Sequence, residues 1–243
     1  MNPPETLSGL LLVDKPASWT SHDIVAKMRG VLGIKRIGHA GTLDPFATGL
    51  VILGINKGTK HLERIMHETK VYETTIKLGA TSSTFDIEGE IIENVVTRPP
   101  TTEAIEKALD QFRGGYEQRA PLFSAKHVNG KRLYDLAREG KATEEMRPSK
   151  FVKIESIDVL AYTYPELALK ITCGSGTYIR SIADDLGRAL GIGGYCLTLR
   201  RTHIGPYQAK DGITPTAYPP TPRNTGKWTI GLFFGTFAPR AFG

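Results

Sequence analysis

Alternating polarity in the extended segments restricts the fold of this chain more than any other feature. The segment KVYETTIKLG (70–79) places four residues on one face of a strand: Tyr72, Thr74, Ile76 and Leu78. The segment LALKITC (167–173) alternates in the same way. Strands of this kind are buried on one side, which is typical of antiparallel or mixed sheets and not of doubly wound parallel sheets. We therefore expect a sheet whose strands are largely antiparallel.

Helical patterns are interleaved with these strands. In the segment 20–33, Thr20 and Asp23 have the spacing of a capping box, and Gly33 would end the helix. In the segment 101–112, the apolar stripe includes Ala104 and Ile105. Periodicity predicts helices over 20–33, 58–68, 101–112 and 177–190, and further strands over 9–16, 49–55 and 194–205. The chain is therefore expected to have an α+β or mixed α/β fold, with a mixed, largely antiparallel sheet flanked by helices.

Positive charge is concentrated in one stretch of the chain. The 243 residues carry a formal net charge of +6, and the 40% of hydrophobic residues suffice for a packed core. Residues 112–153 contain ten Lys or Arg against five Asp or Glu. Such an excess favours a polyanionic partner such as nucleic acid, although a solvated charged surface would have the same composition.

Several classes of protein are disfavoured. The two cysteines, Cys173 and Cys196, lie in no metal-binding spacing, the histidines are scattered, and we expect no metal site. The segments 54–60 and 174–179 match phosphate-loop and dinucleotide motifs only in part, so we expect no cofactor. The chain begins without a secretory signal and has no apolar run of the roughly 18 residues that cross a membrane, so we expect a cytoplasmic protein.

The loop GHAGTLDPFATG (38–49) holds the candidate catalytic group, Asp44. An Asp-Pro pair commonly forms an ordinary turn. Here Gly38, Gly41 and Gly49 would also let the backbone approach a ligand closely. A carboxylate without a metal or a second carboxylate can serve as a lone nucleophile or base if a nearby cation keeps it ionised.

The same loop resembles the catalytic motif of the bacterial TruB-type tRNA pseudouridine synthases. The resemblance continues in order through five further segments: GLLLVDKPASWTSHDIVAKMR, KVYETTIKLGATSSTFDIEGEI, APLFSAKHVNGKRLYDLAREG, CGSGTYIRSIADDLGRALG and LTLRRTHIGPY. Together these segments cover roughly residues 9–207. The resemblance implies a pseudouridine-synthase fold with a basic, RNA-gripping insertion at about 112–153. It also implies an isomerase that converts uridine 55 in the T-loop of tRNA without a cofactor or a guide RNA.

The resemblance assigns roles to individual residues. Asp44 corresponds to the catalytic aspartate, and Arg180 to the arginine that pairs with it. Tyr72 corresponds to a tyrosine that stacks on the target base. Tyr178 and Leu199 correspond to residues that contact the flipped nucleotide, and His39 to one that helps to hold it flipped. The expected partner is the T-arm stem-loop of tRNA, bound by a monomer without a membrane or a small-molecule cofactor.

Alternatives remain open at two of these residues. Tyr72 shares its strand face with Ile76 and Leu78, so it could be a core aromatic residue. Arg180 could instead form an ion pair with Asp184, four residues along the same helix. Two further lysines, Lys15 and Lys60, are expected to contact phosphate rather than to take part in the chemistry.

The end of the chain departs from the family. We expect residues 1–211 to form the catalytic domain and residues 212–243 to form a short, poorly ordered tail. This tail contains five prolines and no acidic residue, and it does not complete the PUA-type domain that usually follows. A short lineage, a truncation or a frameshift would each produce such an ending. The alternatives are an RNA-binding or tRNA-folding protein with impaired catalysis, and a relative of the guide-RNA-dependent archaeal and eukaryotic enzymes.

Overall fold

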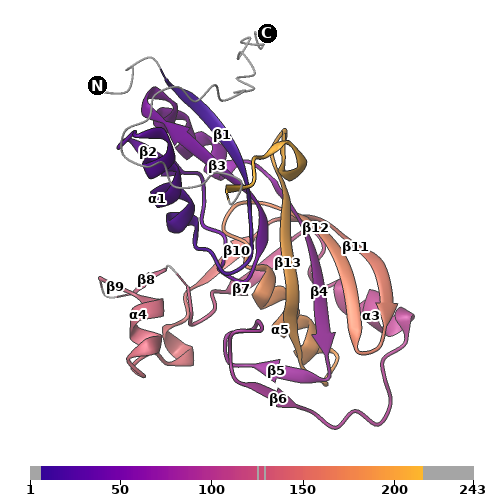
Figure 1. The fold of residues 1–243 in the computed structure, drawn as a ribbon. Helices are drawn as coiled ribbons and strands as arrows, with labels where there is room; N and C mark the ends of the chain where they lie inside the picture. Colours follow the sequence, from indigo (N-terminus) through magenta and orange to yellow (C-terminus); the bar gives the residue numbers. More distant parts are fainter. Residues whose placement is uncertain (1–6, 125, 129, 216–243) are drawn as a thin grey trace.

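The computed structural model describes residues 7–215 except 125 and 129. One large sheet runs through the molecule, with helices packed around it and the middle of the chain extending away from it (Figure 1). The strands are β1 (Gly9–Lys15), β2 (Ile37–His39), β3 (Thr48–Ile55), β4 (Lys70–Leu78), β5 (Ala80–Ser82), β6 (Ile91–Glu93), β7 (Tyr116–Arg119), β8 (His127–Val128), β9 (Lys131–Arg132), β10 (Ser149–Val152), β11 (Ile154–Thr163), β12 (Glu166–Cys173), β13 (Gly194–Ile204) and β14 (Tyr207–Gln208). The α-helices are α1 (Ser21–Leu32), α2 (Leu62–His67), α3 (Thr102–Leu109), α4 (Leu133–Arg138) and α5 (Ile179–Ala189), and short 3₁₀ helices span Asn56–His61, Glu144–Met146 and Ala209–Asp211.

The large sheet has the order β1-β3-β13-β4-β12-β11, with β2 paired to β3 and β14 paired to β13. Its strand pairs are antiparallel except for β13 and β3, which run parallel. The expected mixed, largely antiparallel sheet is therefore confirmed. The parallel pair brings the start of β3, and with it the end of the Asp44 loop, next to the middle of β13 through the register pair Arg201 and Gly49.

Local sequence rules account for helix α1 and strand β4. Thr20 and Asp23 form the expected capping box of α1, and Gly33 ends the helix with a φ of 66°. On β4, the side chains of Tyr72 and Ile76 are buried in the main core, as the alternation predicts.

Other expectations need correction. The segment 58–68 begins as a 3₁₀ helix and becomes α-helical only from Leu62. Ala104 is exposed, not inward-facing, because its place in the first turn of α3 is set by the Thr101 cap, whose Oγ1 accepts a hydrogen bond from the Ala104 amide at 3.3 Å. Both cysteines are buried free thiols.

The end of the described chain lies against the sheet. The Ile213 amide donates a hydrogen bond to the Leu12 carbonyl, and the Ile213 carbonyl accepts one from the Asp14 amide, each at 2.9 Å. Backbone pairing thus continues past residue 211, and the proposed domain boundary stays a prediction. The rest of the expected tail, 216–243, lies outside the described residues. Among the helices of residues 7–215, none is long and apolar enough to pass through a bilayer.

Candidate active site around Asp44

Asp44 lies in the loop that connects β2 to β3. Its side chain retains 32% exposure, so the carboxylate is accessible from solvent. The loop returns to the sheet at Gly49, whose φ is 106°. A Cβ atom at Gly49 would lie 2.3 Å from the Arg201 carbonyl oxygen, so a side chain at this position would collide with the backbone of β13. The close approach of β3 to β13 therefore requires glycine here.

Arg180, in the first turn of α5, binds the Asp44 carboxylate with two of its guanidinium nitrogens. Its Nε donates to Asp44 Oδ2 at 2.9 Å and its Nη2 donates to Oδ1 at 3.0 Å. The guanidinium is only 5% exposed. Although burial opposes the charge, the carboxylates of Asp44 and Asp86 raise the pKa of Arg180. A fixed cation of this kind keeps the Asp44 carboxylate oriented.

The alternative partner of Arg180 is excluded by the geometry. Asp184 forms its ion pair with Arg188, Oδ2 to Nε at 2.8 Å, one turn further along α5. The i, i+4 rule was correct that Asp184 binds an arginine on its own helix, but the arginine lies on the C-terminal side.

A second carboxylate, Asp86, completes the surroundings of Arg180, and sequence reasoning missed it. Asp86 is buried, and its Oδ2 lies 3.2 Å from Arg180 Nη1. The same Nη1 donates to the Thr84 carbonyl at 2.9 Å, and Nη2 also donates to the Phe123 carbonyl at 3.2 Å. One guanidinium thus joins the Asp44 loop, the turn 82–88 and the insertion. The only sequence signal was the position of Asp86 within a matching segment.

Tyr72 and Tyr178, which come from different elements, are both influenced by the Asp44 charge. Burial, with a smaller contribution from the Asp44 charge, raises the pKa of both phenols. Tyr72 is buried on β4, opposite Arg201 of β13. Tyr178 is half-buried at the N-terminus of α5, two residues before Arg180. Tyr72 is therefore a core residue in this structure, and the stacking of a base on it stays a prediction.

Leu199 and His39 lie on strands of the large sheet, and neither contacts the Asp44 carboxylate through a hydrogen bond within the described residues. Leu199 is a buried core residue on β13, opposite Thr74. His39 lies on β2 opposite Leu53, is partly exposed, and has its pKa lowered mainly by burial. Within the described residues, no hydrogen bond connects His39 to Asp44, and the nucleotide contacts of both residues stay predictions.

Two buried basic side chains, Lys15 and Arg201, donate hydrogen bonds to backbone carbonyls of the Asp44 loop. The position of Lys15 corrects the expectation that it contacts phosphate. Lys15 is 1% exposed, and its Nζ donates to the carbonyls of Pro16, Trp19 and Pro45 at 3.0, 2.7 and 3.1 Å. Burial lowers its pKa to about 8. The expectation that Lys15 contacts phosphate is therefore wrong, because its ammonium group is already enclosed by carbonyl oxygens. Lys60 is exposed, so the same expectation stays a prediction there.

Arg201 is the second buried cation, and sequence reasoning missed it as well. It is 2% exposed and donates from Nε to the Leu50 carbonyl at 2.8 Å. Its terminal nitrogens donate to the carbonyls of Thr42 and Gly41 at 3.3 and 3.4 Å. These bonds fasten both sides of the Asp44 loop to β13.

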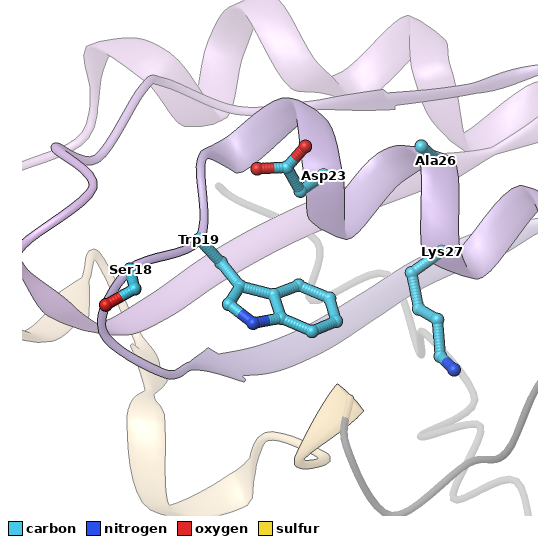
Figure 2. A pocket seen from close by; sticks show the side chains of 5 residues that line it. All are labelled: Ser18, Trp19, Asp23, Ala26 and Lys27. Atoms are coloured by element: carbon cyan, nitrogen blue, oxygen red, sulfur yellow. The ribbon is translucent and has the colours of Figure 1, made fainter.

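A surface hollow of about 350 Å³ lies at the start of α1 and is separate from these groups. Ser18, Trp19, Asp23, Ala26 and Lys27 line it (Figure 2). None of the expected site residues is among them. In the described part of the chain, no group of three or more His, Cys, Asp or Glu side chains is placed to hold a metal ion.

Comparison with known proteins identifies a family and relatives of this chain. Residues 29–179 match the TruB family pseudouridylate synthase N-terminal domain, and residues 180–216 match the tRNA pseudouridylate synthase B C-terminal domain. The tRNA pseudouridine synthase B of Corynebacterium efficiens is 41% identical over 217 residues, which are 88% of this chain and 72% of that protein. That of Gloeothece citriformis is 48% identical over 200 residues, which are 81% of this chain and 64% of that protein.

Solved structures extend the likeness to the fold. A chain in the crystal structure of a Cbf5-Nop10-Gar1 complex superposes with a TM-score of 0.66 at 27% identity, over 85% of this chain and 52% of that chain. A chain in the structure of an H/ACA RNP bound to a substrate RNA gives 0.63 at 25% identity, over 85% and 50%. This protein thus spans about half the length of those chains. With a family match over most of its described residues and an arginine-bound aspartate in the matching loop, the chain belongs to the TruB family of pseudouridylate synthases.

Proposed function

We propose that this chain isomerises uridine to pseudouridine in tRNA, at position 55 of the T-loop, and that it acts as a cytoplasmic monomer without a guide RNA. The observation that carries the proposal is the two-point contact between Arg180 and the partly exposed carboxylate of Asp44. Relatives named tRNA pseudouridine synthase B that share 41–48% of the aligned residues support the choice of substrate.

The chemistry needs only one ionised carboxylate. In the isomerisation the N1–C1′ bond breaks, the uracil turns, a C5–C1′ bond forms, the hydrogen on C5 leaves as a proton, and N1 takes up a proton. No electron is gained or lost overall. Asp44 would act on C1′, add to C6, or remove a proton from the sugar, and each route uses the same carboxylate. The Arg180 guanidinium holds this carboxylate in one orientation through two hydrogen bonds.

The target base must leave its stack before Asp44 can reach it. Enzymes that act on a base inside folded nucleic acid extrude the nucleotide, which costs a few kcal/mol. Stacking of the extruded uracil on Tyr72 or Tyr178 would offset part of this cost. Tyr72 is buried in the structure described here, so we infer that its ring becomes accessible from the Asp44 side when RNA binds.

The basic insertion would hold the T-arm. Residues 112–153 carry twice as many basic as acidic side chains, and Figure 1 shows α4, β8 and β9 extending from the body of the molecule. Contacts of this kind with phosphate make binding strongly salt-dependent.

The test is release of tritium from a T-arm hairpin labelled at C5 of its uridines. We expect the chain alone to release tritium, and Asp44→Asn to abolish release while retaining hairpin binding and the wild-type circular dichroism spectrum. Binding without release by the wild type would reject the proposal and leave an RNA-binding or tRNA-folding protein. Release only after addition of a guide RNA would place the chain with the guide-dependent relatives. Light scattering with and without hairpin tests the monomer.

A further inference from the structure

Arg147 differs from the exposed basic residues of the insertion because it is buried. Its side chain is 3% exposed, at the start of the segment that leads back into β10. Its Nε donates to the Ala120 carbonyl at 2.8 Å, and its Nη1 donates to Glu144 Oε2 at 2.6 Å. These bonds tie the outgoing and returning segments of the insertion together. A buried arginine is therefore a structural part of the insertion and not a free contact for phosphate.

The face of the same guanidinium lies over an aromatic ring in the body of the molecule. The Arg147 Cζ atom is 5.0 Å from the centroid of the Phe85 ring, within the range of a cation–π contact. Phe85 has a φ of 65°, in the left-handed region that large side chains rarely adopt. Its carbonyl accepts a hydrogen bond from the Cys196 amide at 2.9 Å. Arg147 on one side and β13 on the other hold Phe85 in this conformation.

Both neighbours of Phe85 in the chain are partners of Arg180. The Thr84 carbonyl accepts from Arg180 Nη1 at 2.9 Å, and Asp86 Oδ2 lies 3.2 Å from the same nitrogen. Because Phe85 sits between them, its backbone conformation sets where these two acceptors point. Contacts therefore run without interruption from Arg147 through the turn 82–88 to Arg180 and Asp44.

We propose that Arg147 is a positioning residue for the isomerisation: by clamping Phe85 it holds the acceptors that orient Arg180 against Asp44, and it thereby connects the basic insertion to the catalytic carboxylate. The proposal rests on the proposed function. An arginine suits this task because one planar group donates along its edge and stacks with its face, which lysine does not do.

The experiment separates binding from chemistry. Tritium release is followed in single turnover at saturating enzyme, and hairpin affinity is measured separately. We expect Arg147→Met to lower the single-turnover rate at least tenfold and to change the dissociation constant less than threefold. The matched variant is Arg98→Met, which removes an exposed arginine outside the insertion and the Asp44 site. It should keep both the rate and the affinity. An Arg147→Met variant that loses affinity but keeps its rate overturns the proposal.

Phe85→Leu provides a second test, because it removes the ring but leaves the arginine and its hydrogen bonds in place. We expect its rate to fall as far as that of Arg147→Met, and the double variant to be no slower than either. A wild-type rate in Phe85→Leu overturns the proposal even if Arg147→Met does not fold. Where both single variants fold, losses that multiply in the double variant also overturn it. A wild type that releases no tritium would instead reject the proposed function, so the two failures are distinguishable.

Discussion

The guanidinium of Arg180 binds the carboxylate of Asp44 edge to edge, with two hydrogen bonds of 2.9 and 3.0 Å between residues 136 positions apart in the chain. The cation is buried and the carboxylate is partly exposed, so the charge that controls Asp44 is shielded from water while its reactive oxygens stay accessible. A low-dielectric surrounding strengthens such a pair, and a fixed fork orients it.

Substitution of Arg180 tests this pair. Arg180→Lys keeps a positive charge but loses the planar fork, so Asp44 would be held at one point instead of two. We expect the single-turnover rate to fall by roughly 10²-fold, a typical result of displacing a reacting group by about 1 Å. Arg180→Met should also destabilise the fold by about 3 kcal/mol, because Asp86 would remain buried without its cation. Wild-type rates in Arg180→Lys would show that the two-point contact does not matter.

Asp86→Asn examines the second carboxylate. Asparagine keeps an oxygen for the Glu88 amide, which donates to Asp86 Oδ1 at 2.9 Å, but it removes the negative charge beside Arg180. Arg180 would then be balanced by Asp44 alone, and the Asp44 carboxylate would become a weaker base or nucleophile. We expect a loss of roughly 10-fold in single-turnover rate. Residues that hydrogen-bond to the partners of a functional group typically have effects of roughly 10–100-fold. The control is Glu90→Gln, which changes an exposed carboxylate two residues beyond the turn 82–88.

The sequence predicted those elements whose signals are local. Helix α1 carries its cap and its stop signal within its own residues, and β4 alternates without interruption. β11 was not predicted, because its pairing with β12 shifts register between Ile154 and Ser156 and again between Val159 and Ala161. Each shift inverts the alternation, so no period of two extends over the strand.

In the candidate site, too, residues with a local sequence signal were predicted and residues whose partners are distant in sequence were missed. Asp44 was identifiable from its glycine-punctuated loop, whereas the local rule alone would have paired Arg180 with Asp184, which is bound to Arg188. Asp86 and Arg201 were missed because their partners lie in distant segments; Arg201 donates to carbonyls 151–160 residues away. The contacts of Arg201 depend on the parallel pairing of β3 with β13, which no local pattern specifies.

Gly49→Ala tests the close pairing of β3 with β13. The new methyl group would meet the Arg201 backbone at 2.3 Å, at a φ of 106° where alanine is strained. We expect a loss of at least 2 kcal/mol in the free energy of unfolding, and a lower rate because the Asp44 loop must shift. Gly30→Ala is the matched variant, because a Cβ atom there meets nothing within 4 Å inside α1. It should stabilise the fold by about 0.5–1 kcal/mol. Equal melting temperatures for the two variants would contradict the prediction.

Asp184 should make stability depend on pH in a predictable direction. Burial raises its pKa to about 6 from the model-peptide value of 3.8, against the opposing charge of Arg188. The folded state therefore binds the proton more tightly than the unfolded state. Stability from this group is fully present below pH 3.8 and is lost as the pH rises through 6. Asp184→Asn removes this loss. The free energy of unfolding of the variant, relative to that of the wild type, should therefore increase by up to about 3 kcal/mol between pH 4 and pH 7.5.

Urea unfolding at pH 4, 6 and 7.5 measures this difference. Arg188→Gln supplies the opposite change: without the Arg188 cation the pKa of Asp184 should rise further, and the loss of stability should extend to higher pH. The two variants thus differ from the wild type in opposite senses at pH 7.5 and converge on it near pH 4. A gap between Asp184→Asn and the wild type that stays constant over this range would mean that Asp184 ionises in the fold as it does in the unfolded chain.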